Sequence, residues 1–233
     1  MWLFHSPIGR KLVMSLTGLV LILFLLFHLT MNVTAVFSAD AYNKICVVLG
    51  ANWYAVAATI GLGILIVLHF VYAIIITLQN AKARGKNRYA VEIRPKWMSW
   101  ASQNMLVLGF VVGGFLLLHL WQFWSKMMFA ELTGDHEVNL NGHPVSTQDG
   151  YAFICYYFSQ LWVVIAYLAW YVALWFHLTH GFWSAFLTIG WYNHIWQKRW
   201  KWISHIVVTL ILTGFAFVTV TFYMRSLCSG AAY

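Results

Sequence analysis

Charged side chains are scarce in this sequence: Asp, Glu, Lys and Arg make up 9% of 233 residues. A soluble domain has about a quarter. Hydrophobic residues reach 62%, more than one soluble core of this size can bury, so much of that surface must face lipid. The formal net charge of +8 lies in clusters between apolar runs. We therefore expect it to set orientation in a membrane, and we expect no nucleic-acid partner.

Cysteine is also rare, with only Cys46, Cys155 and Cys228. No Cys-x-x-Cys-His motif occurs, which argues against covalent c-type haem. A cysteine-rich ferredoxin motif and a glycine-rich dinucleotide fingerprint are absent too, so we expect no iron–sulfur cluster or flavin in this chain. No small-residue cleavage site closely follows the first apolar run, which we expect to be a retained helix.

Five apolar segments are long enough to cross a membrane, which requires about 20 residues. They predict an all-α integral membrane bundle that forms a single domain. We find no internal repeat, and we expect residues 131–150 to form one external loop. The fourth segment is longer than a bilayer needs, and we expect its last turns, from about Gly181, to leave the apolar layer. The predicted spans are residues 12–37, 53–78, 97–124, 151–189 and 203–224.

Basic residues gather on one side of these spans. They lie before the first span, after the second and after the fourth, whereas the other connections are mixed or acidic. Because basic loops stay in the cytoplasm, we expect a cytoplasmic N-terminus and an external C-terminus. The basic residues are Arg10 and Lys11; Lys82, Arg84, Lys86, Arg88, Arg94 and Lys96; and Lys198, Arg199 and Lys201.

An ionisable side chain inside a membrane span is costly and generally has a function. One histidine lies well inside each of the first four spans: His28, His69, His119 and His177. Imidazole is the usual axial ligand of b-type haem, and two imidazoles can occupy both axial positions of one iron. The four histidines therefore predict two haem b groups.

The depths of these histidines group them into pairs. Counted from the cytoplasmic end at about 1.5 Å per residue, His69 lies about 15 Å deep and His177 about 18 Å deep. His28 lies about 24 Å deep and His119 about 33 Å deep, a looser match that helix tilt can absorb. We expect His69 and His177 to bind one haem iron, and His28 and His119 to bind the other.

Other interpretations of these residues remain open. Each histidine alone would also suit an interhelical hydrogen bond, and copper or zinc bind imidazole, although no carboxylate or thiol cluster accompanies the four at depth. His180 is an alternative ligand to His177, three residues away on the same helix face, or a partner of a haem propionate. Gly18, Gly114 and Gly181 leave room for a flat macrocycle or simply permit close helix packing.

Three spans carry short patterns around their histidines: SLTGL at 15–19, GGFLLLHL at 113–120 and HLTHGFWS at 177–184. With the ordered set of five spans and four histidines, nearly the whole chain resembles the dihaem cytochrome b anchor of succinate:quinone oxidoreductases, which include quinol:fumarate reductases. In that family a glycine follows the fourth-span ligand by four residues, which favours His177 over His180. Some of its fumarate reductases have a proton-carrying glutamate where this chain has Trp175, which puts that proton path in doubt here.

The resemblance implies an electron-transfer role. In the family, a flavoprotein subunit that interconverts succinate and fumarate and an iron–sulfur subunit bind on the cytoplasmic side. Electrons then pass through the haem held by the second and fourth spans to the haem held by the first and third, and exchange with a membrane quinone. The resemblance favours menaquinone, a bacterial cytoplasmic membrane, and a complex that also occurs as a dimer of heterotrimers.

Further candidate residues surround these groups. A quinone near the outer haem needs a proton donor or acceptor within reach of water, although the same residues would also suit an ordinary loop. The candidates are Asp40, Tyr42 and Asn43, with Lys44 beside them. Candidates for the propionates of the inner haem are Arg10, Lys11, Ser15 and His180. The basic, aromatic segments 80–96 and 192–202 suit docking of the iron–sulfur subunit or contact with anionic lipid.

Two alternative functions stay open. The chain would also suit a dihaem cytochrome b of another quinone-linked enzyme, such as a formate dehydrogenase or hydrogenase, or an ascorbate-linked cytochrome. A transporter that relays protons through intramembrane histidines is the second alternative. The lack of repeats and of acidic residues in the spans speaks against the transporter.

Overall fold

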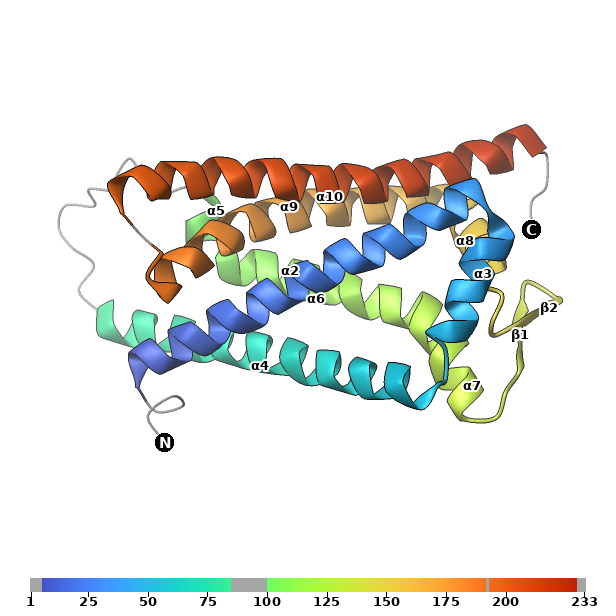
Figure 1. Ribbon diagram of the computed structural model, residues 1–233, viewed down its shortest axis with the longest axis horizontal. Coiled ribbons are helices and arrows are strands. Elements are labelled where there is room, and N and C mark those ends of the chain that lie inside the picture. Colours follow the sequence, from blue (N-terminus) through green and yellow to red (C-terminus); the bar gives the residue numbers. More distant parts are fainter. Residues whose placement is uncertain (1–5, 85–99, 192, 230–233) are drawn as a thin grey trace.

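The structure, a computed structural model, describes residues 6–84, 100–191 and 193–229. Within these ranges, five long helices lie side by side along the long axis (Figure 1). Each is long and apolar enough to cross a membrane, so the chain is a multi-pass membrane protein and the predicted all-α bundle is confirmed. The five are α2 (Pro7–Phe37), α4 (Trp53–Arg84), the continuous run of α6 (Met105–His119), η1 (Leu120–Phe129) and α7 (Ala130–Leu132), α9 (Leu161–Ile189) and α10 (His194–Ser229).

Serine side chains define where α2 begins and ends. Ser6 Oγ accepts a hydrogen bond from Gly9 N at 2.9 Å and so caps the first turn. Ser38 ends the helix with extended backbone and caps the next one, α3 (Ala39–Val48), by accepting a backbone N–H bond at 3.1 Å. This change of direction lets α3 lie across one end of the bundle, beside α8 (Gly150–Phe158) (Figure 1).

The predicted fourth span, residues 151–189, is two helices rather than one. Between α8 and α9, Gln160 has extended backbone, with φ −91° and ψ 114°. The side chains of Ser159 and Gln160 both donate to the carbonyl of Tyr156, at 2.8 and 3.2 Å. Such side chains compete with the helix for its carbonyls, and an apolar pattern that continues on both sides hides the break. The excess length of the predicted span is therefore α8.

Other boundaries also differ from the predicted spans. The first helix begins at Pro7, the second ends at Arg84, the third ends at Leu132 and the last ends at Ser229. Two starts differ as well. The third span does not begin as one helix, because the short α5 (Trp100–Gln103) precedes α6 and Asn104 separates the two; residues 97–99 lie outside the described residues. The last helix begins well before residue 203. Asn193 Oδ1 accepts hydrogen bonds from two backbone N–H groups, at 3.1 and 2.8 Å, and starts α10 within polar sequence that hydropathy does not mark as helix.

Two local features were not predicted from the sequence. The ten residues after His119 form η1, a π-helix, and such wide segments often occur at functional sites. The polar loop between α7 and α8 contains an antiparallel hairpin of β1 (Glu137–Leu140) and β2 (His143–Ser146). Its turn is Asn141–Gly142, with φ values of 53° and 91°, and an Asn-Gly pair is a strong sequence signal for such a turn.

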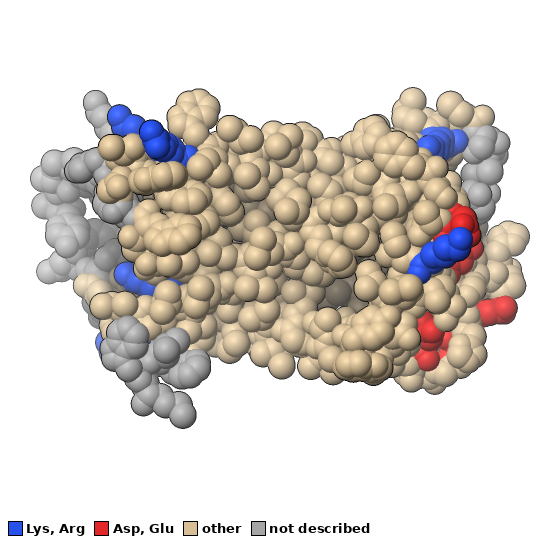
Figure 2. All heavy atoms as spheres, in the orientation of Figure 1, with Lys and Arg blue, Asp and Glu red and all other residues tan. Residues whose placement is uncertain are grey.

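Most of the best-buried side chains lie on α8, α9 and α10, where Phe153, Val163, Val208 and Phe222 are at most 2% exposed. The outer faces of the bundle expose large apolar side chains, as lipid contact requires. Figure 2 shows an uncharged band between the two ends, with the Asp and Glu side chains of this face confined to the end that carries α3 and the hairpin. This separation suits a membrane crossing; which end faces the cytoplasm stays a prediction.

Candidate functional site

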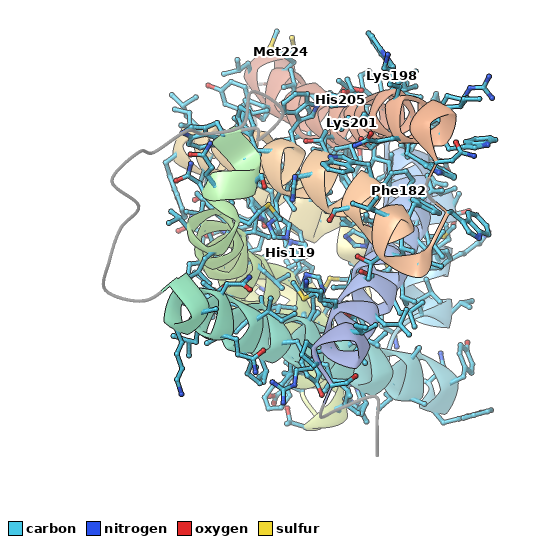
Figure 3. All side chains as sticks on the ribbon, turned by 90° about the vertical axis from the view of Figure 1, so that its left-hand side faces the viewer. His119, Phe182, Lys198, Lys201, His205 and Met224 are labelled. Atoms are coloured by element: carbon cyan, nitrogen blue, oxygen red, sulfur yellow. The ribbon has the colours of Figure 1, made fainter. Side chains whose placement is uncertain are left out.

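The structure brings the four deep histidines together as two pairs. His69 on α4 faces His177 on α9, with ring centroids 6.4 Å apart and ring planes at 69°. His28 on α2 faces His119 at the end of α6, with centroids 5.8 Å apart and planes at 82°. Viewed along the bundle, His119 lies among the helices, whereas Lys198 lies at the periphery (Figure 3). These are the pairs that the depth count predicts.

The ring spacing suits one metal ion between each pair. An imidazole nitrogen lies about 2 Å from a first-row metal ion, so two imidazoles on opposite sides of one ion place their centroids about 6 Å apart. Both pairs match this spacing, at 6.4 and 5.8 Å. All four histidines also keep some accessible surface, although they lie in the middle of the bundle. The residues present therefore fit a cofactor held by two axial imidazoles.

The two pairs lie at different levels of the bundle. Thr17 contacts His69 and lies 11 residues before His28 on α2, which corresponds to about 16 Å along the helix. A Cβ on Gly109 would lie 3.8 Å from Cε1 of His177, and Gly109 precedes His119 by ten residues on α6, about 15 Å. The two helices therefore give the same separation between the pairs.

The His69–His177 pair is bordered by small residues and one hydroxyl. Thr17 Oγ1 lies 3.1 Å from Nδ1 of His69. A Cβ added to Gly18 would lie 3.1 Å from Cε1 of the same ring, so this glycine makes room for the histidine itself. Nδ1 of His177 is buried, and no partner for it lies among the described residues. Each ring thus has a different environment.

Aromatic side chains surround the His28–His119 pair. The ring of His119 lies 5.2 Å from that of Phe123 and 5.8 Å from that of Trp170. Its Nδ1 lies 3.2 Å from the hydroxyl of Tyr167, which donates to Oε1 of Gln122 at 2.9 Å. Gln122 is fully buried; its Nε2 and Nε1 of Trp170 have no partner within the described ranges. These two buried donors are therefore candidates for polar contacts with a ligand beside the pair.

His180 does not face another histidine. Its ring contacts that of Trp183 at 5.3 Å, and the Lys201 ammonium lies 4.8 Å from the centre of the Trp183 ring. His180 Nδ1 is buried and has no partner in the described part of the chain, so it remains a candidate for a polar contact at this end. The facing geometry with His69 belongs to His177, which is the better placed of the two as a ligand.

The other candidates for the haem environment differ in position. Arg10, Lys11 and Ser15 lie in the first turns of α2, on the N-terminal side of Thr17. A Cβ at Gly114 or Gly181 would meet no atom of the described residues within 4 Å, so their helix surface is open. Such open surface would suit contact with a haem macrocycle or with lipid, so the role of the two glycines stays a prediction.

The quinone candidates on α3 have separate roles. Asp40 pairs with Lys44 at 2.7 Å, and both side chains are about three-quarters exposed, at 77% and 75%. The amide of Asn43 donates to Oδ1 of Asp149 at 2.7 Å and accepts from Tyr151 N at 2.9 Å, which ties α3 to the start of α8. Asn43 therefore has a structural task that uses both ends of its amide.

Tyr42 is the candidate directed toward the His28–His119 pair. Its hydroxyl lies 3.4 Å from Oδ1 of Asn32, whose amide donates to the carbonyl of His28 at 2.8 Å. Burial raises the pKa of the Tyr42 hydroxyl, which keeps its proton. Among the α3 residues, this one best suits a hydrogen bond to a quinone oxygen.

The basic end of the bundle carries a cluster of stacked aromatics. Phe186 and Trp200 stack with centroids 3.9 Å apart, Trp191 lies beside them, and the Arg199 guanidinium lies 5.2 Å from the centre of the Trp196 ring. Trp196, Arg199 and Trp200 belong to the predicted docking segment 192–202, whereas Phe186 and Trp191 precede it. Tyr192 of that segment lies outside the described residues. Residues 85–99, which include most of the other predicted docking segment, 80–96, also lie outside the described residues.

Thr17, Gln122 and Tyr167 were not among the predicted site residues, apart from the place of Thr17 in the first-span pattern. Their contacts with histidines join different helices, and no local sequence pattern predicts these contacts. No family model, curated protein or solved structure matches this chain.

Proposed function

We propose that each histidine pair holds one haem b, and that the chain is the membrane-anchor subunit that carries electrons to or from a quinone. The observation that carries this proposal is the presence of two facing imidazole pairs with the spacing of bis-imidazole coordination. Each pair would offer two imidazole ligands to the iron of one haem. When bound, haem supplies a one-electron redox centre.

In this proposal the protein binds and orients the two haems and places them in succession along the electron path. His69 and His177 hold the first centre and His28 and His119 the second, about 15 Å further along the bundle by helix rise. This arrangement splits a crossing of about 30 Å of hydrocarbon into shorter electron-transfer steps. Aromatic side chains beside His119 would limit the access of water to the second centre.

The resemblance to succinate:quinone oxidoreductases supplies the partners in this proposal. The basic, aromatic end around Trp196 and Arg199 docks an iron–sulfur subunit that connects to a flavoprotein, and the coupled reaction interconverts succinate and fumarate. The end that carries α3 receives the quinone, menaquinone by resemblance. At the position of the glutamate found in some relatives, Trp175 donates from Nε1 to Thr209 Oγ1 at 2.9 Å, which links α9 to α10 instead of carrying protons.

The decisive experiment is a pyridine haemochrome count on the purified complex, with its subunits identified. We expect two haems b per chain and a co-purifying flavoprotein and iron–sulfur protein. His69→Ala or His177→Ala should each remove one haem and leave the other, whereas His180→Ala should retain both. His205→Ala is the matched control, because within the described ranges that ring contacts the Lys201 carbonyl, at 2.7 Å, and the ring of Trp175, but no other histidine.

Each alternative function makes a different prediction for this experiment. Loss of both haems, or of neither, in the His69 and His177 variants would contradict the pairing. A purified protein without haem would exclude every cytochrome and favour the proton-relay transporter. Two haems with a different redox partner would keep the dihaem cytochrome and replace the succinate–fumarate reaction by that of another dehydrogenase or hydrogenase.

A further inference from the structure

In each histidine pair, one imidazole has a hydroxyl group at its Nδ1. The two contacts are Thr17 Oγ1 with His69 at 3.1 Å and Tyr167 Oη with His119 at 3.2 Å. A ring nitrogen at this distance either donates to the hydroxyl or accepts from it, and the choice decides which nitrogen of the ring carries the proton.

The single proton of Thr17 is already used within its own helix. Thr17 Oγ1 lies 2.9 Å from the carbonyl oxygen of Val13 and 3.0 Å from that of Met14. Carbonyl oxygens only accept, so in these two contacts the hydroxyl is the donor, which is the usual back-bond of a threonine within a helix. The oxygen of Thr17 is then the acceptor toward His69, whose Nδ1 carries the hydrogen. In this tautomer the lone pair of His69 lies on Nε2.

The same reasoning applies to Tyr167. Its hydroxyl donates to Oε1 of Gln122 at 2.9 Å, and Gln122 is held in a fully buried position. A phenol has one proton, so its oxygen accepts from Nδ1–H of His119. The lone pair of His119 is again on Nε2. Different residue types on different helices thus give the same tautomer in the two pairs.

We infer that Thr17 and Tyr167 are positioning residues, which hold Nδ1 of His69 and of His119 in the protonated form and so present Nε2 to iron. This inference rests on the proposed function. A hydrogen bond from the distal N–H of a metal-binding imidazole fixes its tautomer and ring plane and makes the ligand more electron-rich. An electron-rich ligand favours ferric over ferrous iron, so loss of the bond should raise the midpoint potential of that haem alone.

The test compares isosteric variants in the purified complex, with haem count, redox titration and low-spin ferric EPR as readouts. Thr17→Val should raise the midpoint potential of the His69–His177 haem and shift its EPR signal, and Thr17→Ser should restore both. Tyr167→Phe should do the same to the His28–His119 haem only. Two single-haem variants, His69→Ala for the first pair and His28→Ala for the second, assign each potential to its pair.

Tyr171→Phe is the matched control. Tyr171 lies one turn after Tyr167 on α9, and its hydroxyl bonds Thr219 Oγ1 at 2.9 Å rather than a histidine. We expect this variant to leave both potentials and both EPR signals unchanged. Loss of just the first haem in Thr17→Val, regained in Thr17→Ser, would also support the assignment.

Three results would overturn the inference. Two bound haems with unchanged potentials and EPR signals in Thr17→Val and Tyr167→Phe would show that the hydroxyls do not act on the ligands. Equal shifts of both haems, or an equal effect in Tyr171→Phe, would show a general structural disturbance. If the purified wild-type protein contains no haem, the proposed function itself is wrong. Failure of the inference and failure of the proposed function are therefore distinguishable.

Discussion

Replacement of Gly18 by alanine probes how closely the ring of His69 packs against α2. The added Cβ would lie 3.1 Å from Cε1 and 3.6 Å from Nδ1 of that ring. Ordinary carbon contacts begin at about 3.5 Å. The imidazole, which Thr17 also contacts at 3.1 Å, must therefore move by a few tenths of an ångström. Overpacking of this kind costs about 1–3 kcal/mol.

Gly109→Ala is the matched comparison, because its Cβ would meet Cε1 of His177 at 3.8 Å, an ordinary contact. Gly61→Ala adds a second control, since no described neighbour lies within 4 Å of its Cβ. All three replacements gain the same helix propensity, about 1 kcal/mol, so that gain cancels between them. We expect Gly18→Ala to be less stable than Gly109→Ala by about 1–3 kcal/mol.

The assay is reversible unfolding in mixed detergent and SDS micelles, followed by circular dichroism. Haem absorbance of the same samples reports whether the displaced His69 ring also disturbs its cofactor. Equal stability of the Gly18 and Gly109 variants, with unchanged absorbance, would refute the close packing of the His69 ring against α2.

Two further predictions concern the end of the bundle that carries α3. Asp149→Ala should lower the free energy of unfolding by about 1–3 kcal/mol, because Oδ1 of Asp149 caps α8 at Ala152 N (3.0 Å) and accepts from Asn43 (2.7 Å). Asp149→Asn should lose less stability. An unchanged unfolding curve of Asp149→Ala would contradict the role of Asp149 in joining α3 to α8. Burial raises the pKa of the Cys46 thiol from its ordinary 9.0 to about 11, so at pH 8 the folded protein has about a hundredfold less Cys46 thiolate. Iodoacetamide should therefore alkylate Cys46 at least about a hundred times faster after unfolding in SDS, and equal rates would count against its burial.

The long spans could be predicted because composition alone requires them. Few charges interrupt the apolar runs, and a helix satisfies its own backbone in lipid, so length and hydropathy suffice to place five helices. Polar sequence at helix ends is less informative. Hydropathy missed the start of α10 at Asn193 and the break at Ser159–Gln160, because both depend on side chains that bond to backbone groups nearby.

The candidate site was predictable only in part. Depth along a helix follows from residue count, so the sequence could group His69 with His177 and His28 with His119. The direction in which a side chain points around the helix does not follow, because these helices are apolar on nearly every face and show no amphipathic pattern. The candidates on α3 show the same limit, since Asp40 and Asn43 are three residues apart, yet one is exposed and the other joins two helices.

The sequence by itself determined that the chain lies in a membrane and that one deep histidine belongs to each of four helices. Both conclusions follow from the cost of charge in lipid, which needs no knowledge of neighbouring helices. Only the tertiary structure decided which rings face each other at about 6 Å and which hydroxyls meet their Nδ1 atoms. Those contacts depend on how each helix is rotated against its neighbours, and that rotation is set by the packing of the whole bundle.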